Sequence, residues 1–412
     1  MDRILLKNIF SLFSIQAVNY FLPLILIPYL VRVLGIENFG IYGLILAIIQ
    51  YLIIIIDYGF NFTATKEISI YRGNKLYISK VFCSVIFCKI ILSLLALFVI
   101  FLITIFYEED KYLVLSFYFG FFLVIGSALF PVWLYQGYEK MIVIAISNFI
   151  ARLIGILLVF ILVKKANDTY IAILIQGIMS IIAATIALTM AFYLKLVTIV
   201  KFERKDIINH FKSGWDIFIS TSFVSLYTTS IPIVLGATSG AASVGIYSAA
   251  DKIKLALQGF IGPISQALYP RLSRLMSESK QEALSLIKQS FKYFVIPLFA
   301  LSFFVFLFSD KIVYIIYGQG FSSTADILKI IIWIPPIIGI GNLLGVQIML
   351  PMGLYKEFSR TYIFTGVIGF VLIYFLSKYY SYYGVSISLL LIEIMVVLLF
   401  FCFLKKASLG NK

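Results

Sequence analysis

The sequence is poor in charged residues and in histidine. Only 13% of its 412 residues are charged, whereas 62% are hydrophobic. A soluble domain is nearer half apolar and a quarter charged, so this composition excludes an ordinary soluble protein and places the chain in lipid. The single histidine, His210, excludes a metal site built from several histidines and a histidine proton relay through a membrane. It lies in a polar connector, where we expect an ordinary loop residue.

Cysteines and the motifs of soluble enzymes are also scarce. The three cysteines, Cys83, Cys88 and Cys402, lie in or beside apolar runs, so we expect no disulfide framework. The sequence contains no G-x-x-x-x-G-K-[ST] phosphate loop and no D-x-D pair. No connector is long enough for a soluble catalytic domain, so we expect no enzyme activity, no cofactor and no metal. The net charge of +14 does not predict nucleic acid binding, because the basic residues flank apolar runs.

Long apolar segments are abundant. A helix needs about 20 apolar residues to cross the roughly 30 Å of hydrocarbon in a bilayer. Twelve segments fit, so we predict an all-α polytopic membrane protein with twelve transmembrane helices. The first segment is too long for the apolar part of a cleavable signal peptide, and we expect it to be retained. The predicted segments are 9–31, 40–60, 81–106, 112–136, 141–163, 170–194, 215–236, 244–268, 291–309, 327–350, 361–377 and 384–404.

The basic residues of the connectors predict the orientation. Alternate connectors, together with both termini, hold 22 of the 33 lysines and arginines, and the opposite side holds seven. Cytoplasmic loops carry such an excess. We therefore predict a protein of the bacterial cytoplasmic (inner) membrane with both termini in the cytoplasm.

Short stretches recur about half a chain length apart. The triplet Gly40–Tyr42 opens the second predicted segment, and Gly245–Tyr247 opens the eighth. Similarly, Gln136–Lys140 ends the fourth segment, and Met352–Lys356 ends the tenth. Parallel repeats with substrate between them are typical of transporters. We therefore predict two six-helix lobes, residues 1–206 and 207–412.

Four basic residues lie deep inside the apolar segments: Lys89, Arg152, Lys252 and Lys254. A cation at the centre of a bilayer costs about 2.5–3.5 kcal/mol on insertion scales, so each needs water, a counter-charge or an anionic ligand. Lys89 could instead extend its ammonium to the interface. Lys254 could pair with Asp251, three residues earlier on the same helix face. Arg152 is too central for the interface, which favours a functional role.

Carboxylates are fewer in these segments. Asp57 could cap a helix end or pair with Lys66, and Glu393 could pair with a deep cation or carry a coupling proton. With Asp251 and Glu393 as the deep acids, four positive charges face two negative ones. This balance favours an anionic cargo, and a phosphate or pyrophosphate group suits arginine through bidentate hydrogen bonding.

Five stretches together resemble the Wzx-type flippases of lipid-linked oligosaccharides, which belong to the superfamily that includes the MATE multidrug exporters. The stretches, at the spacing of that family, are YLVRVLGIENFGIY (29–42), DYGFNFTATKE (57–67), PVWLYQGYEKM (131–141), residues 234–271 with VGIYSAADKIKLALQGFIGPISQALYPR, and GIGNLLGVQIMLPMGLYK (339–356).

The resemblance implies a fold of twelve helices in two lobes around a basic central cavity. It also implies movement of an undecaprenyl-pyrophosphate-linked oligosaccharide repeat unit, as for O-antigen, from the inner to the outer leaflet by alternating access. The expected partners are this substrate, membrane lipid, a coupling proton or sodium ion, and the polysaccharide polymerase machinery. The substrate-binding residues that we predict are Arg152, Lys89, Lys254 and Lys252. The predicted counter-charges or coupling sites are Asp57, Asp251 and Glu393.

Two other functions fit the same architecture. An ion-coupled multidrug exporter would place acidic cavity residues against cationic drugs and confer drug resistance on overexpression. A flippase for the peptidoglycan precursor would be essential for growth, so the viability of a deletion strain distinguishes it.

Overall fold

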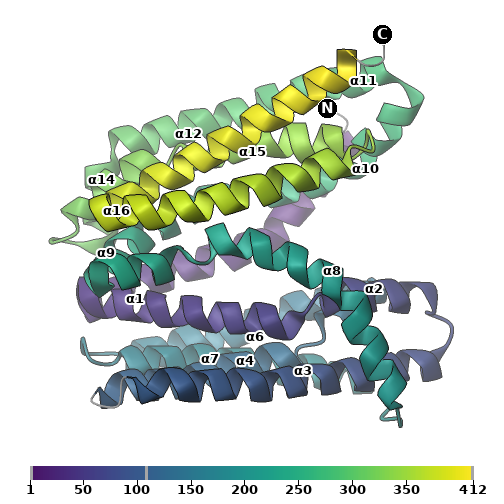
Figure 1. Cartoon of the computed structure of the whole chain (residues 1–412), viewed down its shortest axis with the longest axis horizontal. Coiled ribbons are helices and arrows are strands. Elements are labelled where there is room, and N and C mark those ends of the chain that lie inside the picture. Colours follow the sequence, from purple (N-terminus) through teal and green to yellow (C-terminus); the bar gives the residue numbers. More distant parts are fainter. Residues whose placement is uncertain (1–2, 107–109, 410–412) are drawn as a thin grey trace. The chain divides into compact units, whose positions relative to one another are not determined.

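The computed structural model describes residues 3–106 and 110–409, which are helical throughout with short connections and no strand (Figure 1). The elements are α1 (Arg3–Asp57), α2 (Phe60–Ile70), α3 (Lys75–Ile105), α4 (Lys111–Leu129), α5 (Val132–Gly137), α6 (Met141–Leu162), α7 (Thr169–Tyr193), α8 (Arg204–Thr228) and α9 (Ile231–Gln258). They continue with α10 (Ile261–Glu278), α11 (Lys280–Ser290), the π-helical turn η1 (Phe291–Val295), α12 (Ile296–Leu307), α13 (Ser309–Tyr317), α14 (Ser322–Ile331), α15 (Ile334–Leu344), the π-helical turn η2 (Gly345–Met349) and α16 (Tyr355–Leu409).

The helices form two compact units. Unit 1 comprises residues 1–32 and 226–412, and unit 2 comprises residues 33–225. The lobe boundary expected after residue 206 falls inside α8, most of which belongs to unit 2, and the first 32 residues group with unit 1. The division into two six-helix lobes therefore stays a prediction.

Arg32 shows why the start of α1 belongs to unit 1. Its Nε donates a hydrogen bond to the Ile316 carbonyl oxygen at 2.9 Å, and its Nη2 donates to the Ile315 carbonyl oxygen. Both carbonyls lie in the last turn of α13, where a helix has unpaired acceptors and a partial negative charge. A guanidinium, with its planar set of donors, can satisfy two of these acceptors at once.

Three long helices each contain one residue with non-helical backbone angles. These residues are Gly35 in α1 (φ 75°), Gly240 in α9 (φ 81°) and Ser381 in α16 (φ 51°). Positive φ is easy for glycine but unfavourable for serine. Each break falls in a connector that the sequence analysis expects between two membrane segments. In α16 the two halves fold back side by side, and Phe358 stacks on Phe400 with ring centroids 5.5 Å apart (Figure 1).

Serine and threonine hydroxyls join the breaks of α9 and α16 within unit 1. The Thr238 and Ser377 hydroxyls share a hydrogen bond, and Ser239 Oγ donates to the Ser377 carbonyl oxygen at 3.2 Å. The hydroxyls of Ser243 and Ser381 lie 3.0 Å apart. These bonds hold the strained Ser381 turn against the neighbouring turn at Gly240.

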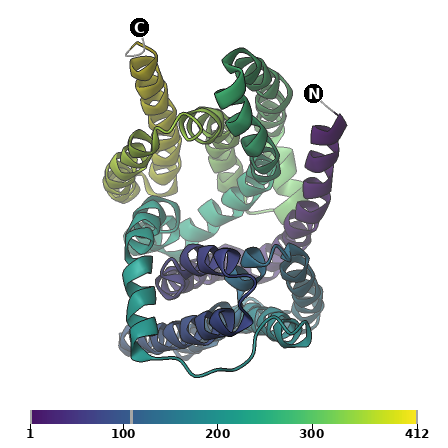
Figure 2. The same ribbon diagram turned by 90° about the vertical axis from the view of Figure 1, so that its right-hand side faces the viewer.

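Unit 2 is built around close contact between α4 and α7. Figures 1 and 2 show α3, α4, α6 and α7 as neighbouring helices, and α7 contacts both α4 and α6. Gly126 of α4 lies so close to Ser180 of α7 that an added Cβ would stand 2.3 Å from Ser180 Oγ. Small residues of this kind let helix backbones approach each other in lipid, where packing rather than the hydrophobic effect drives association.

Apolar side chains cover the outside of the helices as well as the inside. On α6, Ala151 and Val159 are buried, whereas Leu157 and Ile161 are about two-thirds exposed (62% and 65%). Nine helical stretches within the described residues are long and apolar enough to cross a membrane. The expectation of an all-α polytopic membrane protein is therefore confirmed.

Candidate functional site

Lys89 and Asp57 form a buried ion pair in unit 2. Lys89 lies on α3 with only 1% of its side chain exposed, and its Nζ is 2.8 Å from Asp57 Oδ1 at the end of α1. The ammonium therefore does not extend to the membrane interface, and Asp57 pairs with Lys89 rather than with Lys66. Such a pair compensates a charge that would otherwise be strongly unfavourable inside protein and lipid.

A sharp break after α1 positions Asp57. Tyr58 (φ 40°) and Gly59 (φ 79°) both adopt left-handed backbone angles there. A Cβ on Gly59 would stand 2.9 Å from Ile217 Cβ of α8, so glycine is needed for the close approach of this turn to α8. The Tyr58 ring stacks on Phe218 of α8, with centroids 4.7 Å apart. This packing fixes the turn and, with it, the carboxylate that faces Lys89.

A second buried pair lies on α9 in unit 1. Lys254 is 7% exposed and pairs with Asp251, three residues earlier, as the spacing indicates. The Tyr247 hydroxyl lies 3.5 Å from Asp251 Oδ1, and the Tyr317 hydroxyl of α13 donates to the Ala249 carbonyl oxygen at 2.8 Å. Polar groups thus line one side of α9 where it packs inside the unit.

The remaining sites that the sequence predicts are half-buried. Glu393 lies on α16 and interacts electrostatically with Lys254. Lys252 lies on α9, and no carboxylate within residues 3–106 and 110–409 pairs with it. Arg152 lies on α6, one position after the buried Ala151, and α6 contacts α7. Each of these side chains keeps part of its surface accessible.

The structure brings the predicted residues into two groups. Lys89 and Asp57 meet in unit 2, while Lys254, Asp251 and Glu393 gather in unit 1. The contact of Asp57 with Lys89 adds a third deep carboxylate, so the deep side chains comprise four cations and three carboxylates. The excess of positive charge is smaller than the sequence analysis expects. Among the described residues, no group of three histidine, cysteine, aspartate or glutamate side chains has the arrangement of a metal site.

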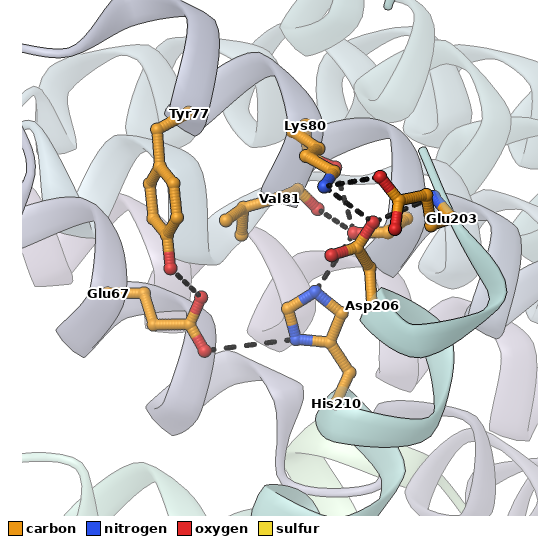
Figure 3. A network of polar contacts seen from close by, with 8 residues as sticks. Glu67, Tyr77, Lys80, Val81, Glu203, Asp206 and His210 are labelled. Atoms are coloured by element: carbon orange, nitrogen blue, oxygen red, sulfur yellow. Dashed lines mark hydrogen bonds and ion pairs between the residues drawn. The ribbon is translucent and has the colours of Figure 1, made fainter. Parts of the chain in front are cut away.

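A polar network that the sequence analysis missed surrounds His210 in unit 2 (Figure 3). The expectation of an ordinary loop residue is wrong, because His210 lies in α8 and is 5% exposed. Its Nε2 is 2.9 Å from Ser84 Oγ of α3, and its Nδ1 is 3.9 Å from Glu67 Oε1 of α2. The one feature of the sequence that could have indicated this network is Asp206, which lies four residues before His210 and so on the same face of a helix.

Asp206 anchors the start of α8 to α3. Its Oδ2 is 3.0 Å from Lys80 Nζ and accepts a hydrogen bond from the Glu203 amide at 2.7 Å. Burial alone would raise the pKa of Asp206, but the Glu203 amide and Lys80 together lower it below the usual value. Burial lowers the pKa of His210, although the Asp206 charge opposes this. At neutral pH the network therefore contains an ionised Asp206 and a neutral His210.

Two curated proteins resemble the chain over nearly its whole length. One from Escherichia coli (strain K12), named "Putative O-antigen transporter", is 37% identical over 404 residues, which cover 98% of this chain and 97% of that protein. One from Shigella dysenteriae with the same name is 32% identical over 396 residues, which cover 95% and 98%.

Solved structures share the fold at low sequence identity. An inward-facing multidrug resistance transporter of the MATE family has a TM-score of 0.76 at 16% identity, and 96% of each chain is covered. The lipid II flippase MurJ, in an inward closed conformation, has a TM-score of 0.71 at 15% identity, with 97% of this chain and 87% of that chain covered. The sequence pattern of the family described as "Polysaccharide biosynthesis protein" matches residues 5–276. With two-thirds of its length matched and two whole-length relatives above 30% identity, the chain belongs to the polysaccharide biosynthesis protein family.

Proposed function

We propose that this protein moves an undecaprenyl-pyrophosphate-linked oligosaccharide repeat unit from the inner to the outer leaflet of the bacterial cytoplasmic membrane by alternating access. The observation that carries the proposal is the whole-length likeness to two proteins named as O-antigen transporters, at 37% and 32% identity. The MATE-like fold supports a transport role, and it is shared by exporters of drugs and a flippase of lipid.

The proposed topology has twelve membrane crossings in two six-helix lobes, with both termini in the cytoplasm. Three breaks support the number of crossings: dividing the nine candidate spans of the described residues at Gly35, Gly240 and Ser381 gives twelve segments. Two of these are short on their own, but residues 25–34 continue the earlier part of α1, and residues 231–239 directly follow α8. The excess of basic residues in alternate connectors supports the orientation.

Half-buried cations are the proposed contacts of the pyrophosphate. Lys89 and Lys254 are almost fully buried and already paired with carboxylates, whereas Arg152 and Lys252 keep accessible surface. A guanidinium binds phosphate oxygens through two parallel hydrogen bonds, and an ammonium acts as a point charge. Arg152 and Lys252 therefore contact phosphate directly, while Lys89 and Lys254 add positive potential from within their ion pairs.

Glu393 is the proposed coupling site. Its carboxylate is half-buried on α16 and is influenced by the Lys254 charge, so uptake of a proton or sodium ion there would change the balance of the Lys254–Asp251 pair. The coupled ion would thus alter the positive potential offered to an anionic substrate. The flipped unit would then pass to the polysaccharide polymerase machinery.

The experiment compares Arg152→Gln, Lys252→Gln and Lys165→Gln in a strain whose surface glycan depends on this protein. Lys165 is an exposed cation in the connector before α7, so it serves as the matched control. We expect the first two variants to lower surface glycan several-fold at normal protein abundance, with lipid-linked units accumulating in the membrane, and the control to behave as the parent protein. Wild-type glycan in both test variants would contradict the binding role.

The same strain distinguishes the other two functions. A glycan-deficient but viable deletion strain with unchanged drug sensitivity supports the proposal. Loss of viability would point to the peptidoglycan precursor, and unchanged glycan with altered resistance to cationic drugs would point to an exporter.

A further inference from the structure

The hydrogen bonds around Ser84 determine which nitrogen of His210 carries its proton. Ser84 Oγ donates towards the carbonyl oxygens of Lys80 and Val81 in its own helix, at 2.8 and 3.1 Å. With its single hydrogen engaged there, Ser84 Oγ can only accept from His210 Nε2, 2.9 Å away. The neutral ring therefore carries its hydrogen on Nε2, and Nδ1 presents a lone pair.

His210 Nδ1 is a buried acceptor without a hydrogen bond. The atom that faces it, Glu67 Oε1, is 3.9 Å away, beyond hydrogen-bond reach. The other Glu67 oxygen, Oε2, lies 3.4 Å from the Tyr77 hydroxyl of α3. Buried polar atoms without a partner are rare and call for an explanation. A nitrogen lone pair in this position is a binding site for one proton.

Other charged groups surround this nitrogen from each packed element. Glu67 faces it from α2, and Tyr77 and Lys80 lie on α3. Asp206 lies on α8 itself, and Glu203 immediately precedes that helix. Lys80 is 3.0 Å from Asp206 and 3.8 Å from Glu203, so it neutralises much of the negative charge that could stabilise an imidazolium.

A proton on Nδ1 is consequently less favourable in this packed arrangement than in water. The imidazolium would be 5% exposed, with one good hydrogen bond and a second donor out of reach of its acceptor. Burial lowers the pKa of His210 from its ordinary value of 6.5. By linkage, the packed arrangement loses stability as the pH falls through 6.5 towards the lowered value, because the unpacked state then binds more protons.

We propose that His210 is a proton-responsive latch: when Nδ1 takes up a proton, the first turns of α8 are released from α2 and α3. The position of His210 near the start of α8 matters for the connection between the two units, which the proposed transport function does not address. Unit 2 ends within α8, and the chain continues from α8 directly into α9 of unit 1. The release would thus loosen the helix that connects the two units along the chain.

Amide hydrogen exchange of the full-length protein in lipid nanodiscs tests the latch. Protection of residues 204–214 is measured at pH 8.0 and pH 5.5, corrected for the intrinsic pH dependence of exchange, with residues 141–162 of α6 as an internal reference. An exposed imidazole with a pKa of 6.5 can shift the packing equilibrium by at most about tenfold at pH 5.5. We expect a several-fold loss of protection in 204–214 at pH 5.5 and none in α6.

Three variants separate the latch from a merely structural histidine. His210→Gln keeps an amide donor for Ser84 but does not titrate, so we expect equal protection at both pH values. Glu67→Gln removes a carboxylate that stabilises an imidazolium at position 210. Protonation then disfavours the packed arrangement more strongly, so we expect a larger loss of protection in residues 204–214 at pH 5.5. Ser84→Ala removes the acceptor and should lower protection at both pH values while keeping the pH response.

Two results would overturn the proposal. One is unchanged protection of residues 204–214 between pH 8.0 and pH 5.5 in the parent protein. The other is a full pH response in His210→Gln, which would assign the titration to Asp206, Glu203 or Glu67. Neither result depends on glycan transport, so the latch and the proposed function can fail separately.

Discussion

The Lys89–Asp57 pair allows a double-mutant cycle that measures how much a buried charge pair contributes to this fold. Lys89 is 1% exposed, so replacing its partner in Asp57→Asn leaves an ammonium in the interior with no compensating charge. Removing one partner of a buried pair is typically destabilising by about 3–5 kcal/mol. The Asp57 side chain is 32% exposed, and water reaching that side should bring the loss to about 3 kcal/mol, the lower end of this range.

The other variants of the cycle should behave differently. In Lys89→Met the unpaired Asp57 carboxylate retains access to solvent, so we expect a smaller loss than in Asp57→Asn. The double variant Asp57→Asn/Lys89→Met contains no buried charge, and we expect its stability to approach that of the parent protein. The free energy of unfolding is measured in mixed micelles by titration with a denaturing detergent. Losses that simply add in the double variant would refute a favourable coupling between the two side chains.

Transport by the double variant distinguishes two roles of Lys89. If its fold is as stable as that of the parent, a remaining loss of surface glycan belongs to the charges of the pair, either that which Lys89 offers the substrate or that of Asp57 as a coupling site. We expect a partial loss, smaller than in Arg152→Gln, because the Lys89 ammonium is closed off by protein. Wild-type export would limit Lys89 to stabilising the turn at Asp57.

Two further predictions concern packing and surface charge. Gly126→Ala would place a Cβ 2.3 Å from Ser180 Oγ and should destabilise unit 2 by about 1–3 kcal/mol in a thermal-unfolding assay. The control Gly73→Ala, whose Cβ would have no atom within 4 Å, should be neutral in the same assay. Equal unfolding midpoints of the two variants would contradict close α4–α7 packing. The hydrogen bond from Arg72 lowers the pKa of Glu139 below its ordinary 4.5. The Arg72–Glu139 ion pair therefore stabilises the folded protein above pH 4.5, and this stabilisation is lost as the pH falls through the lowered pKa. The difference in unfolding midpoint between Glu139→Gln and the parent should therefore shrink on acidification, and a constant difference from pH 7 to pH 4 would contradict the linkage.

Hydropathy was sufficient to predict most of the long apolar helices, because a helix that satisfies its own backbone and exposes apolar side chains needs no distant partner. The segment expected at 215–236 is an exception, because it is divided between the end of α8 and the start of α9. The segment expected at 141–163 corresponds to α6, Met141–Leu162. The breaks at Gly35, Gly240 and Ser381 fall in expected connectors because polar and flexible residues accumulate between apolar runs.

The start of α8 could not be predicted in the same way. Residues 204–214 are too polar to resemble a membrane segment, and their helix is stabilised by partners far away in the sequence. Ser84 lies 126 positions before His210, and Lys80 contacts Asp206 from the same distant helix. A polar segment that is buried by tertiary contacts has the composition of a loop, which is why the expectation for His210 was wrong.

Pairing of the deep charges shows the same dependence on sequence distance. Lys254 and Asp251 are three residues apart, and helical geometry alone brings them onto one face. Lys89 and Asp57 are 32 residues apart and meet only because the turn at Tyr58 and Gly59 packs against α8 and directs the carboxylate towards α3.

This second pairing changes the electrostatic argument for the substrate. If every deep cation had its own carboxylate, the positive side chains would explain folding and say nothing of cargo. Lys89 and Lys254 are paired in this way and almost fully buried, whereas Lys252 and Arg152 are half-buried. In the proposed function, direct contact with an anionic lipid is therefore assigned to these two more accessible residues. If Arg152→Gln and Lys252→Gln leave transport intact, the deep cations have a structural role, and only the family relationship supports a pyrophosphate cargo.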